Sequence, residues 1–576
     1  MFKLAKQTTV AFGVPVALFV LSAKPAQSAT FNLQEASVSS INRAFDAGAL
    51  TSEELVQLYL NRIEAYDDAG PALNSLITVN PNALQTAAAL DLERQATGPR
   101  SILHGIPVIL KDNFDTFDLP TTGGSVALQG SIPPDDAYVV KQLRDAGAII
   151  LAKANLDEWA HGGAPGGGYS SVGGQTKNPY NLNRGPAGSS GGPGAAIAAN
   201  FGTIGLGTDT GGSIRGPAAA NGLVGIKPTL GLTSRDGIIP FSLTLDTGGP
   251  LTRTVTDAAI TLGFMTGVDP NDPVTKESEG KFFTDYTQFL DKDALQGARI
   301  GVARDFFGRN SDIDQAIEQA IAEIKALGAT VVESVTFPTE VLAARGGIYS
   351  TISDTEFKAQ IADYLETLSD EYPKTLAEVI EISQSPEVAN SEFPVFPGVL
   401  TRLLEAEVRG PLTDPAYLDA LNNGLALIKN TTLNVLDSND LDAIIYPTSG
   451  CPASPGSGIV DPTYVCGQGR SATNIANLTG FPDVQVPAGF TSDGLPIALS
   501  FFGNAYSEPN LLGYAYAYEQ ATKLRRPSSL VPALPGEKIE YETVPEPGMA
   551  IALGVAGLSA LGLKRRRVQT PGLSGH

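Results

Sequence analysis

The sequence predicts an α/β fold, in which a largely parallel or mixed central sheet is flanked by helices. Short apolar runs that have the pattern of buried strands occur at residues 106–110, 148–151, 298–302, 329–332 and 443–446. Helical patterns lie between these runs. With 576 residues, 42% of them hydrophobic, the chain can bury a large core.

Two helices are predicted from their end signals. Thr51 and Glu54 have the spacing of a capping box, and apolar residues follow on one helical face. Residues 312–327 form the clearest amphipathic stretch, and Gly328 follows it as a stop signal. The alternation of helices and buried strands therefore suggests an α/β fold around a largely parallel or mixed sheet, and the length of the chain allows several domains.

The charge of the chain argues against a nucleic acid partner. The formal net charge is −22, and the only ionisable side chains in residues 1–29 are three lysines. Removal of that segment would make the protein more negative still. Because phosphate backbones require a basic surface, we exclude nucleic acid as a partner and interpret the acidity as a solvated surface.

The N-terminal segment has the pattern of a secretory signal peptide. Basic residues at Lys3 and Lys6 precede an apolar run over 10–23, and small residues up to Ala29 provide a cleavage site after Ser28 or Ala29. The alternative, a transmembrane anchor, is disfavoured because the run is too short to span a bilayer. We therefore predict export across the inner membrane, to the periplasm, the cell surface or the medium.

The C-terminal segment carries a second targeting pattern. The motif Val544-Pro-Glu-Pro-Gly548 precedes an apolar run over 549–563 and a basic cluster over 564–567. This order resembles the PEP-CTERM sorting signal of bacteria, which implies processing by an exosortase; a plain tail anchor is the alternative. The predicted organisation is signal peptide 1–29, globular domain 30–526, linker 527–544, sorting tail 545–567 and C-terminal extension 568–576.

The cysteines and histidines are too few for a metal cluster. Cys451 and Cys466 are 15 positions apart, and in an oxidising compartment this pair can form a disulfide, with two unpaired thiols as the alternative. The three histidines, at 104, 161 and 576, lack ligand spacing. The sequence therefore predicts no metal and no cofactor.

Two glycine-rich segments, 185–194 and 205–218, are the strongest signal for a site. A P-loop is excluded because no lysine lies between Lys177 and Lys227, and the spacing does not fit a dinucleotide fingerprint. Serines surrounded by glycines instead provide a backbone whose amides can converge on a negative charge. This is the environment of an oxyanion hole.

A serine nucleophile needs a base, and the scarcity of histidine restricts the choice. We interpret His104 as structural, since it lies just before an apolar strand, and His161 as the only competing histidine. Lys111, at the end of the buried run 106–110, is the alternative base, because burial disfavours the charged ammonium form.

At this point the sequence resembles the amidase signature family over residues 37–526. The match includes 103–112, 148–155, 174–179, both glycine-rich segments, 225–229, 477–482 and 486–490. The resemblance implies a single amidase-signature domain in which Lys111 is the base, Ser189 is a bridging residue after a cis peptide bond, and Ser213 is the nucleophile. The 24-residue interval between the two serines favours Ser189 over Ser190 as the bridge.

The resemblance also implies the residues around the nucleophile. The backbone amides of Thr210, Gly211, Gly212 and Ser213 are expected to form the oxyanion hole. Asp209, Arg215 and Ser190 are expected to support this loop. We expect substrate choice to depend on residues 162–168 and on the segment that contains both cysteines.

The implied reaction is hydrolysis of a carboxamide through an acyl-enzyme on Ser213. Two alternatives remain: an amidotransferase-type subunit that acts on mischarged tRNA, and a surface or matrix protein that keeps the fold without catalysis. Besides the amide substrate, the expected partners are the membrane, contacted transiently by both terminal segments, an exosortase, and a second copy of the chain in a homodimer.

Overall fold

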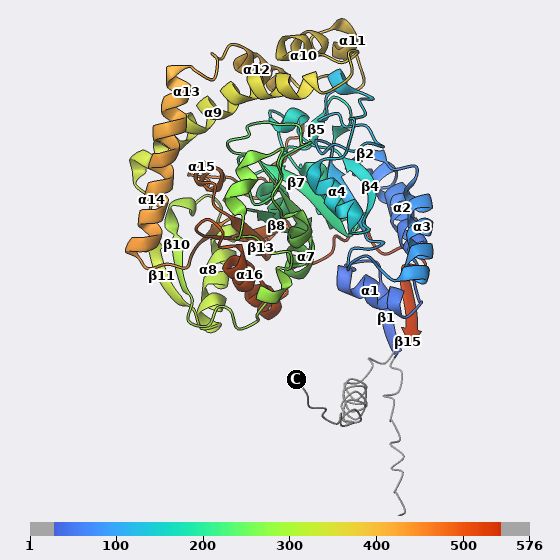
Figure 1. The fold of residues 1–576 in the computed structure, drawn as a ribbon. Coiled ribbons are helices and arrows are strands. Elements are labelled where there is room, and N and C mark those ends of the chain that lie inside the picture. Colours follow the sequence, from blue (N-terminus) through green and yellow to red (C-terminus); the bar gives the residue numbers. More distant parts are fainter. Residues whose placement is uncertain (1–27, 543–576) are drawn as a thin grey trace, which may run out of the picture. The chain divides into compact units, whose positions relative to one another are not determined.

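The computed structural model describes residues 28–542 (Figure 1). Residues 31–539 form one compact unit, while residues 28–30 and 540–542 belong to a second one. Residues 1–27 of the predicted signal peptide, the sorting tail and the C-terminal extension lie outside the described residues. No helix within residues 28–542 has both the length and the apolar character needed to cross a membrane.

The centre of the large unit is an eleven-stranded mixed sheet. From one edge to the other, its strands are β11 (Thr330–Val335), β10 (Arg299–Ala303), β12 (Ala443–Pro447), β14 (Pro496–Phe502), β13 (Asp483–Phe490), β8 (Val224–Lys227), β9 (Thr247–Thr252), β7 (Ile204–Asp209), β3 (Pro107–Lys111), β4 (Ile149–Ala154) and β2 (Leu76–Val79). Parallel pairs near both edges flank an antiparallel centre. The predicted α/β fold and its five strands are confirmed.

The helices that accompany the sheet include both that were predicted. The helices are α1 (Val38–Asp46), α2 (Ser52–Ile63), α3 (Ala83–Thr97), α4 (Tyr138–Asp145), α5 (Gly191–Ala198), α6 (Arg215–Ala220), α7 (Val255–Met265), α8 (Ser311–Ala326), α9 (Thr339–Glu366), α10 (Leu376–Ser383), α11 (Pro386–Ala389), α12 (Pro397–Glu407), α13 (Pro415–Asp419), α14 (Leu425–Ser438), α15 (Ile475–Thr479) and α16 (Glu508–Thr522). Thr51 and Glu54 form the expected capping box of α2, and Asn310 caps α8.

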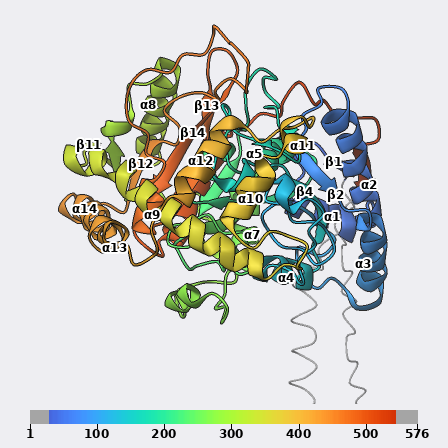
Figure 2. The same ribbon diagram turned by 90° about the horizontal axis from the view of Figure 1, so that it is seen from above.

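Helices α7, α8 and α16 pack against the central strands in one large apolar cluster. Ile317 of α8 and Leu512 of α16 are buried there with Leu499 of β14. A second cluster joins α9, α10 and α12 to the loops beyond β3 and β4, where Trp159 packs edge-on against Phe357 of α9. Figures 1 and 2 both show α9, α10 and α12 together beside the sheet, so this helical layer adjoins the loops of the site.

Two short strand pairs complete the described structure. β5 (Tyr169–Ser170) pairs with β6 (Gly174–Gln175), and β1 (Ser28–Asn32) pairs with β15 (Lys538–Glu542). The position of β15 bears on the predicted linker, because it falls inside residues 527–544.

The predicted linker over 527–544 is wrong for most of its length, because the compact unit extends to Ile539. Val531 and Glu537 are buried, although the segment is polar and rich in proline. Glu537 forms an ion pair at 2.8 Å with the buried Arg62 of α2. Arg62 also donates to the carbonyl of Val531 at 2.8 Å. The partner that anchors this segment is distant in sequence, so composition alone could not indicate it.

We expect Glu537→Ala to lower the free energy of unfolding by about 3–5 kcal/mol, because it leaves the Arg62 guanidinium buried without its counter-charge. Glu318→Ala is the matched control, since the Glu318 side chain, which pairs with Arg304, is 51% exposed. Its expected cost is below about 1 kcal/mol. Denaturant unfolding of both variants measures the difference, and equal losses would contradict a structural role for this ion pair.

Candidate active site

The site is built where two neighbouring parallel strands end. β3 and β7 pair in parallel, with Leu110 opposite Leu206. Their carboxyl ends therefore meet at one edge of the sheet, which places Lys111 beside the turn that follows β7. Ser213 lies in that turn before α6, and Ser189 lies in the loop before α5.

Lys111 is fully buried and hydrogen-bonded to two hydroxyl groups. Its Nζ lies 2.8 Å from Oγ of Ser189 and 2.7 Å from Oγ1 of Thr208. Asn113 donates to the same Thr208 hydroxyl at 3.1 Å. Burial lowers the pKa of Lys111 to about 7, against the opposing effects of Asp157, Asp246 and Asp209. The amine can therefore be neutral near neutral pH.

The two serines border one small cavity. Ser189 and Ser213 both line a space of about 160 Å³, and Ser213 is partly exposed within it. The peptide bond between Gly188 and Ser189 is cis. Among residues 28–542, no hydrogen bond joins the two serine hydroxyls, whereas the backbone N–H of Ser190 donates to the carbonyl of Ser213 at 3.2 Å. The structure thus brings Lys111 into contact with Ser189 and places Ser213 in the same cavity.

Ser190 faces β7 rather than the cavity. Its Oγ donates to the carbonyl of Thr208 at 3.2 Å and accepts from the N–H of the same residue at 3.3 Å. The hydroxyl therefore fixes the loop to the strand. This geometry agrees with the supporting role expected for Ser190 and leaves Ser189 as the serine that meets the lysine.

The Asp209 carboxylate organises the loop that carries Ser213. It accepts hydrogen bonds from the backbone N–H groups of Gly212 at 2.7 Å and Ile214 at 3.0 Å. The expectation that Gly212 supplies an oxyanion donor is therefore corrected, because its N–H is already committed to Asp209. No hydrogen bond within residues 28–542 uses the N–H groups of Thr210, Gly211 or Ser213, so these three amides remain for a ligand.

Arg215 lies between two buried carboxylates. Its Nε is 3.1 Å from Asp209, and its Nη1 is 2.9 Å from Asp483 of β13. Asn477 of α15 accepts from Arg215 at 2.8 Å and donates to Asp209 at 2.9 Å. Although burial acts in the opposite direction, the Arg215 charge holds the pKa of Asp209 well below its usual range. The Asp209–Arg215 pair was expected from the sequence. The further partners of Arg215, Asp483 and Asn477, were not.

The two histidines of the domain have different surroundings. His104 is fully buried; its Nε2 lies 2.8 Å from the Leu90 carbonyl and its Nδ1 accepts from the N–H of Arg100. His161 lines the cavity, and its Nε2 lies 3.5 Å from Asp354. Burial lowers the pKa of His161. Neither histidine is hydrogen-bonded to a serine hydroxyl within the described residues, whereas Lys111 is.

Several residues of the cavity were not anticipated. Asp157 follows β4, Phe241 lies in a loop, Tyr349 comes from α9 and Arg402 from α12. Tyr349 and Arg402 lie more than a hundred residues beyond the two glycine-rich segments. No local pattern distinguishes them from other residues of amphipathic helices. Gly162, from the loop expected to border the pocket, does line this cavity.

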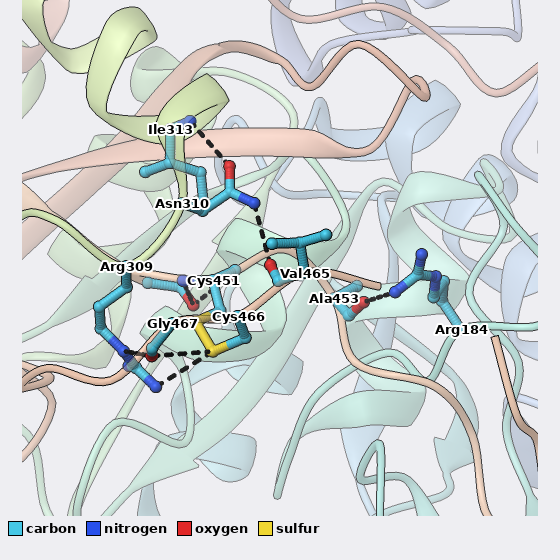
Figure 3. The surroundings of a disulfide bond; sticks show 10 residues. Arg184, Arg309, Asn310, Ile313, Cys451, Ala453, Val465, Cys466 and Gly467 are labelled. Atoms are coloured by element: carbon cyan, nitrogen blue, oxygen red, sulfur yellow. Dashed lines mark hydrogen bonds between the residues drawn. A yellow bond between two sulfur atoms is a disulfide. The ribbon is translucent and has the colours of Figure 1, made fainter. Parts of the chain in front are cut away.

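A second cavity, of about 240 Å³, lies beside the disulfide that joins Cys451 to Cys466. Figure 3 shows Arg309 directed at the disulfide, where it donates to Sγ of Cys466 at 3.2 Å. Ala187 and Gly216, which flank the serine segments, also line this cavity. The cysteine segment thus lies near the site, as expected. No cluster of three or more potential metal ligands occurs in residues 28–542.

Comparison with known proteins gives matches over most of the chain. The family model for amidases matches residues 54–512. A probable amidase of Arabidopsis thaliana is 38% identical over 517 residues, which cover 88% of this chain and 93% of that protein. A glutamyl-tRNA(Gln) amidotransferase subunit from Alkaliphilus metalliredigens is 36% identical, with coverage of 85% and 96%.

The fold is also similar to solved structures. A native peptide amidase from Stenotrophomonas maltophilia has a TM-score of 0.79 and 40% sequence identity, and the match covers 86% of this chain and 99% of that one. A peptide amidase in complex with the competitive inhibitor chymostatin has the same TM-score with 41% identity, and the match covers 86% and 99% of the two chains.

We expect the rate at which Ser213 reacts with a fluorophosphonate to rise with pH through about 7. Below the pKa of Lys111 the amine is protonated and cannot accept a proton, so the rate should fall about tenfold per pH unit; above it the rate should level off. Mass spectrometry of the labelled protein measures the rate, with Ser213→Ala as the unreactive control. A rate independent of pH between 6 and 8 would contradict Lys111 as the base.

Proposed function

The chain belongs to the amidase family and is a hydrolase of amide carbon–nitrogen bonds, and we propose that it acts through Ser213, Ser189 and Lys111. The observation that carries this proposal is the contact between the buried Lys111 amine and the Ser189 hydroxyl at 2.8 Å. Burial supplies the neutral amine that a base requires. No other amine or imidazole within residues 28–542 is hydrogen-bonded to Ser189.

The proposed reaction begins with attack of the Ser213 oxygen on the amide carbonyl. As the new C–O bond forms, the Ser213 proton passes to Ser189, and the Ser189 proton passes to neutral Lys111. Ser189 then donates one proton to the leaving nitrogen while the C–N bond breaks, and Lys111 returns its proton to Ser189. Water hydrolyses the resulting ester by the same relay and regenerates Ser213.

The free backbone amides of the nucleophile loop support stabilisation of the tetrahedral intermediate. The N–H groups of Thr210, Gly211 and Ser213 are uncommitted within the described residues, and Asp209 holds the loop by accepting from Gly212 and Ile214. A single donor of this kind contributes about 3 kcal/mol in enzymes where it has been removed. The Asp209 carboxylate thus has a positioning role in this mechanism.

An amidotransferase-type subunit is the second candidate function. The amidotransferase relatives, such as that of Microcystis aeruginosa at 37% identity over 94% of its length, favour it. The net charge of −22 opposes it, because a tRNA substrate requires a basic surface. Binding of tRNA by the purified protein at moderate salt would favour this candidate over a free-standing amidase.

We further propose that the protein is exported. The basic, apolar and small-residue order of residues 1–29 supports a signal peptide, and the order of residues 544–567 supports a PEP-CTERM sorting tail. The Cys451–Cys466 disulfide supports an oxidising destination. Processing of both ends would release the domain outside the inner membrane.

We expect Ser213→Ala and Lys111→Ala each to lower kcat/KM on carboxamides by at least about 1000-fold, since each removes a member of the relay. Primary amides, anilides, amino-acid amides and acyl ethanolamides form the substrate panel. Lys292→Ala is the control, because that side chain is 76% exposed. Retention of full activity in either relay variant would contradict the mechanism.

Export predicts a mature N-terminus at Ala29 or Thr30. Expression of the full chain in a bacterium, followed by fractionation and intact-mass measurement, tests this directly. A variant without residues 2–29 should remain in the cytoplasm. Recovery of the full chain from the cytoplasm with Met1 or Phe2 at its N-terminus would contradict export.

A further inference from the structure

Asp157 is a buried carboxylic acid at the catalytic cavity to which the proposed mechanism gives no role. It follows β4, is 6% exposed, and lines the cavity together with Ser189 and Ser213. Its backbone N–H donates to the carbonyl of Ser189 at 3.0 Å. Asp157 is therefore fixed directly to the residue proposed to return the proton to the leaving group.

The two carboxylate oxygens of Asp157 have different surroundings. Oδ1 accepts a hydrogen bond from the backbone N–H of Gly168. Oδ2 lies against Gly188, so closely that a Cβ on that glycine would be 2.0 Å away. No hydrogen bond or ion pair within residues 28–542 involves Oδ2, and this oxygen is not among the fully enclosed polar atoms without a partner. It therefore remains available to a ligand at the Ser189 side of the cavity.

The backbone around Asp157 is held in a conformation that limits its movement. Trp159 and Ala160 have φ angles of 58° and 55°, which non-glycine residues seldom adopt. The backbone N–H of Trp159 donates to the carbonyl of Gly123 at 2.8 Å, and the Trp159 ring is buried against α9. These contacts fix the loop, so Oδ2 is presented in one position.

The chemistry of a carboxylate defines what it can bind there. An ionised carboxylate is only an acceptor, and Asp157, which lines the cavity, can accept from a donor that a ligand brings there. In the proposed mechanism the leaving nitrogen must lie near Ser189 to receive its proton. Since Oδ2 lies against Gly188, the residue before Ser189, we expect this nitrogen to lie beside Oδ2. An amide NH2 group carries N–H donors at this position, whereas an ester oxygen carries none.

We propose that Asp157 is a specificity-determining residue that accepts an N–H hydrogen bond from the leaving nitrogen, and that it thereby selects carboxamides over esters. The inference rests on the proposed function. The hydrogen bond strengthens as the nitrogen gains a proton and positive charge, so its contribution falls mainly on kcat.

The test compares a carboxamide with the methyl ester of the same acyl group. Asp157→Asn retains an oxygen for the Gly168 N–H and replaces Oδ2 by an NH2 donor. We expect kcat/KM for the carboxamide to fall about 10- to 100-fold, the range of one charge-assisted hydrogen bond, with the ester rate little changed. The amide-to-ester ratio is the readout, because a general loss of folded enzyme lowers both rates equally.

Glu158→Gln is the matched control, since Glu158 is a buried acid on the same loop that accepts from Ser171 and does not line the cavity. Its amide-to-ester ratio should equal that of the unaltered enzyme. An unchanged ratio in Asp157→Asn, or an equal change in both variants, would overturn the inference and leave the relay intact. Failure of the unaltered enzyme to cleave either substrate would instead reject the proposed function, and this inference with it.

Discussion

The site depends on the burial of one lysine amine. Lys111 ends a fully buried strand, and its only side-chain hydrogen bonds within residues 28–542 are to the hydroxyls of Ser189 and Thr208. No carboxylate in that range forms an ion pair with it, so desolvation dominates and lowers the pKa of the amine to about 7. By contrast, the neighbouring strand places Lys153 within 3.2 Å of Asp112. Lys111 thus has only hydroxyl partners, whereas Lys153 is paired with a carboxylate.

The remaining charges near the site are paired so that they support the loops. Arg215 is shared between Asp209 and Asp483, which links the turn after β7 to the distant strand β13. Asp209 in turn accepts from the backbone N–H groups on either side of Ser213. A buried ion network of this kind is costly to break, because removing one member leaves an unpaired charge. It fixes the position of Ser213 without entering the proposed proton path.

The walls of the catalytic cavity come from parts of the chain that have little in common in sequence. The loop after β4 contributes Asp157 and His161, while α9 and α12 contribute Tyr349 and Arg402. The residues of the proposed relay thus lie at the sheet edge and in the loops next to it. A separate helical layer, which includes α9 and α12, closes the cavity. Substrate choice can vary through this layer without disturbing the contact between Lys111 and Ser189.

By itself, the sequence determined the fold class, the buried strands and the serine segments, because apolar periodicity and glycine-rich spacing are local properties. The scarcity of histidine, together with the two serine segments, also made Lys111 the candidate base. Only the tertiary structure decided which amides were free, since Asp209 occupies the N–H of Gly212. It likewise placed residues 527–539 in the compact unit through the ion pair between Arg62 and Glu537. These features depend on contacts between distant residues, which no local pattern records.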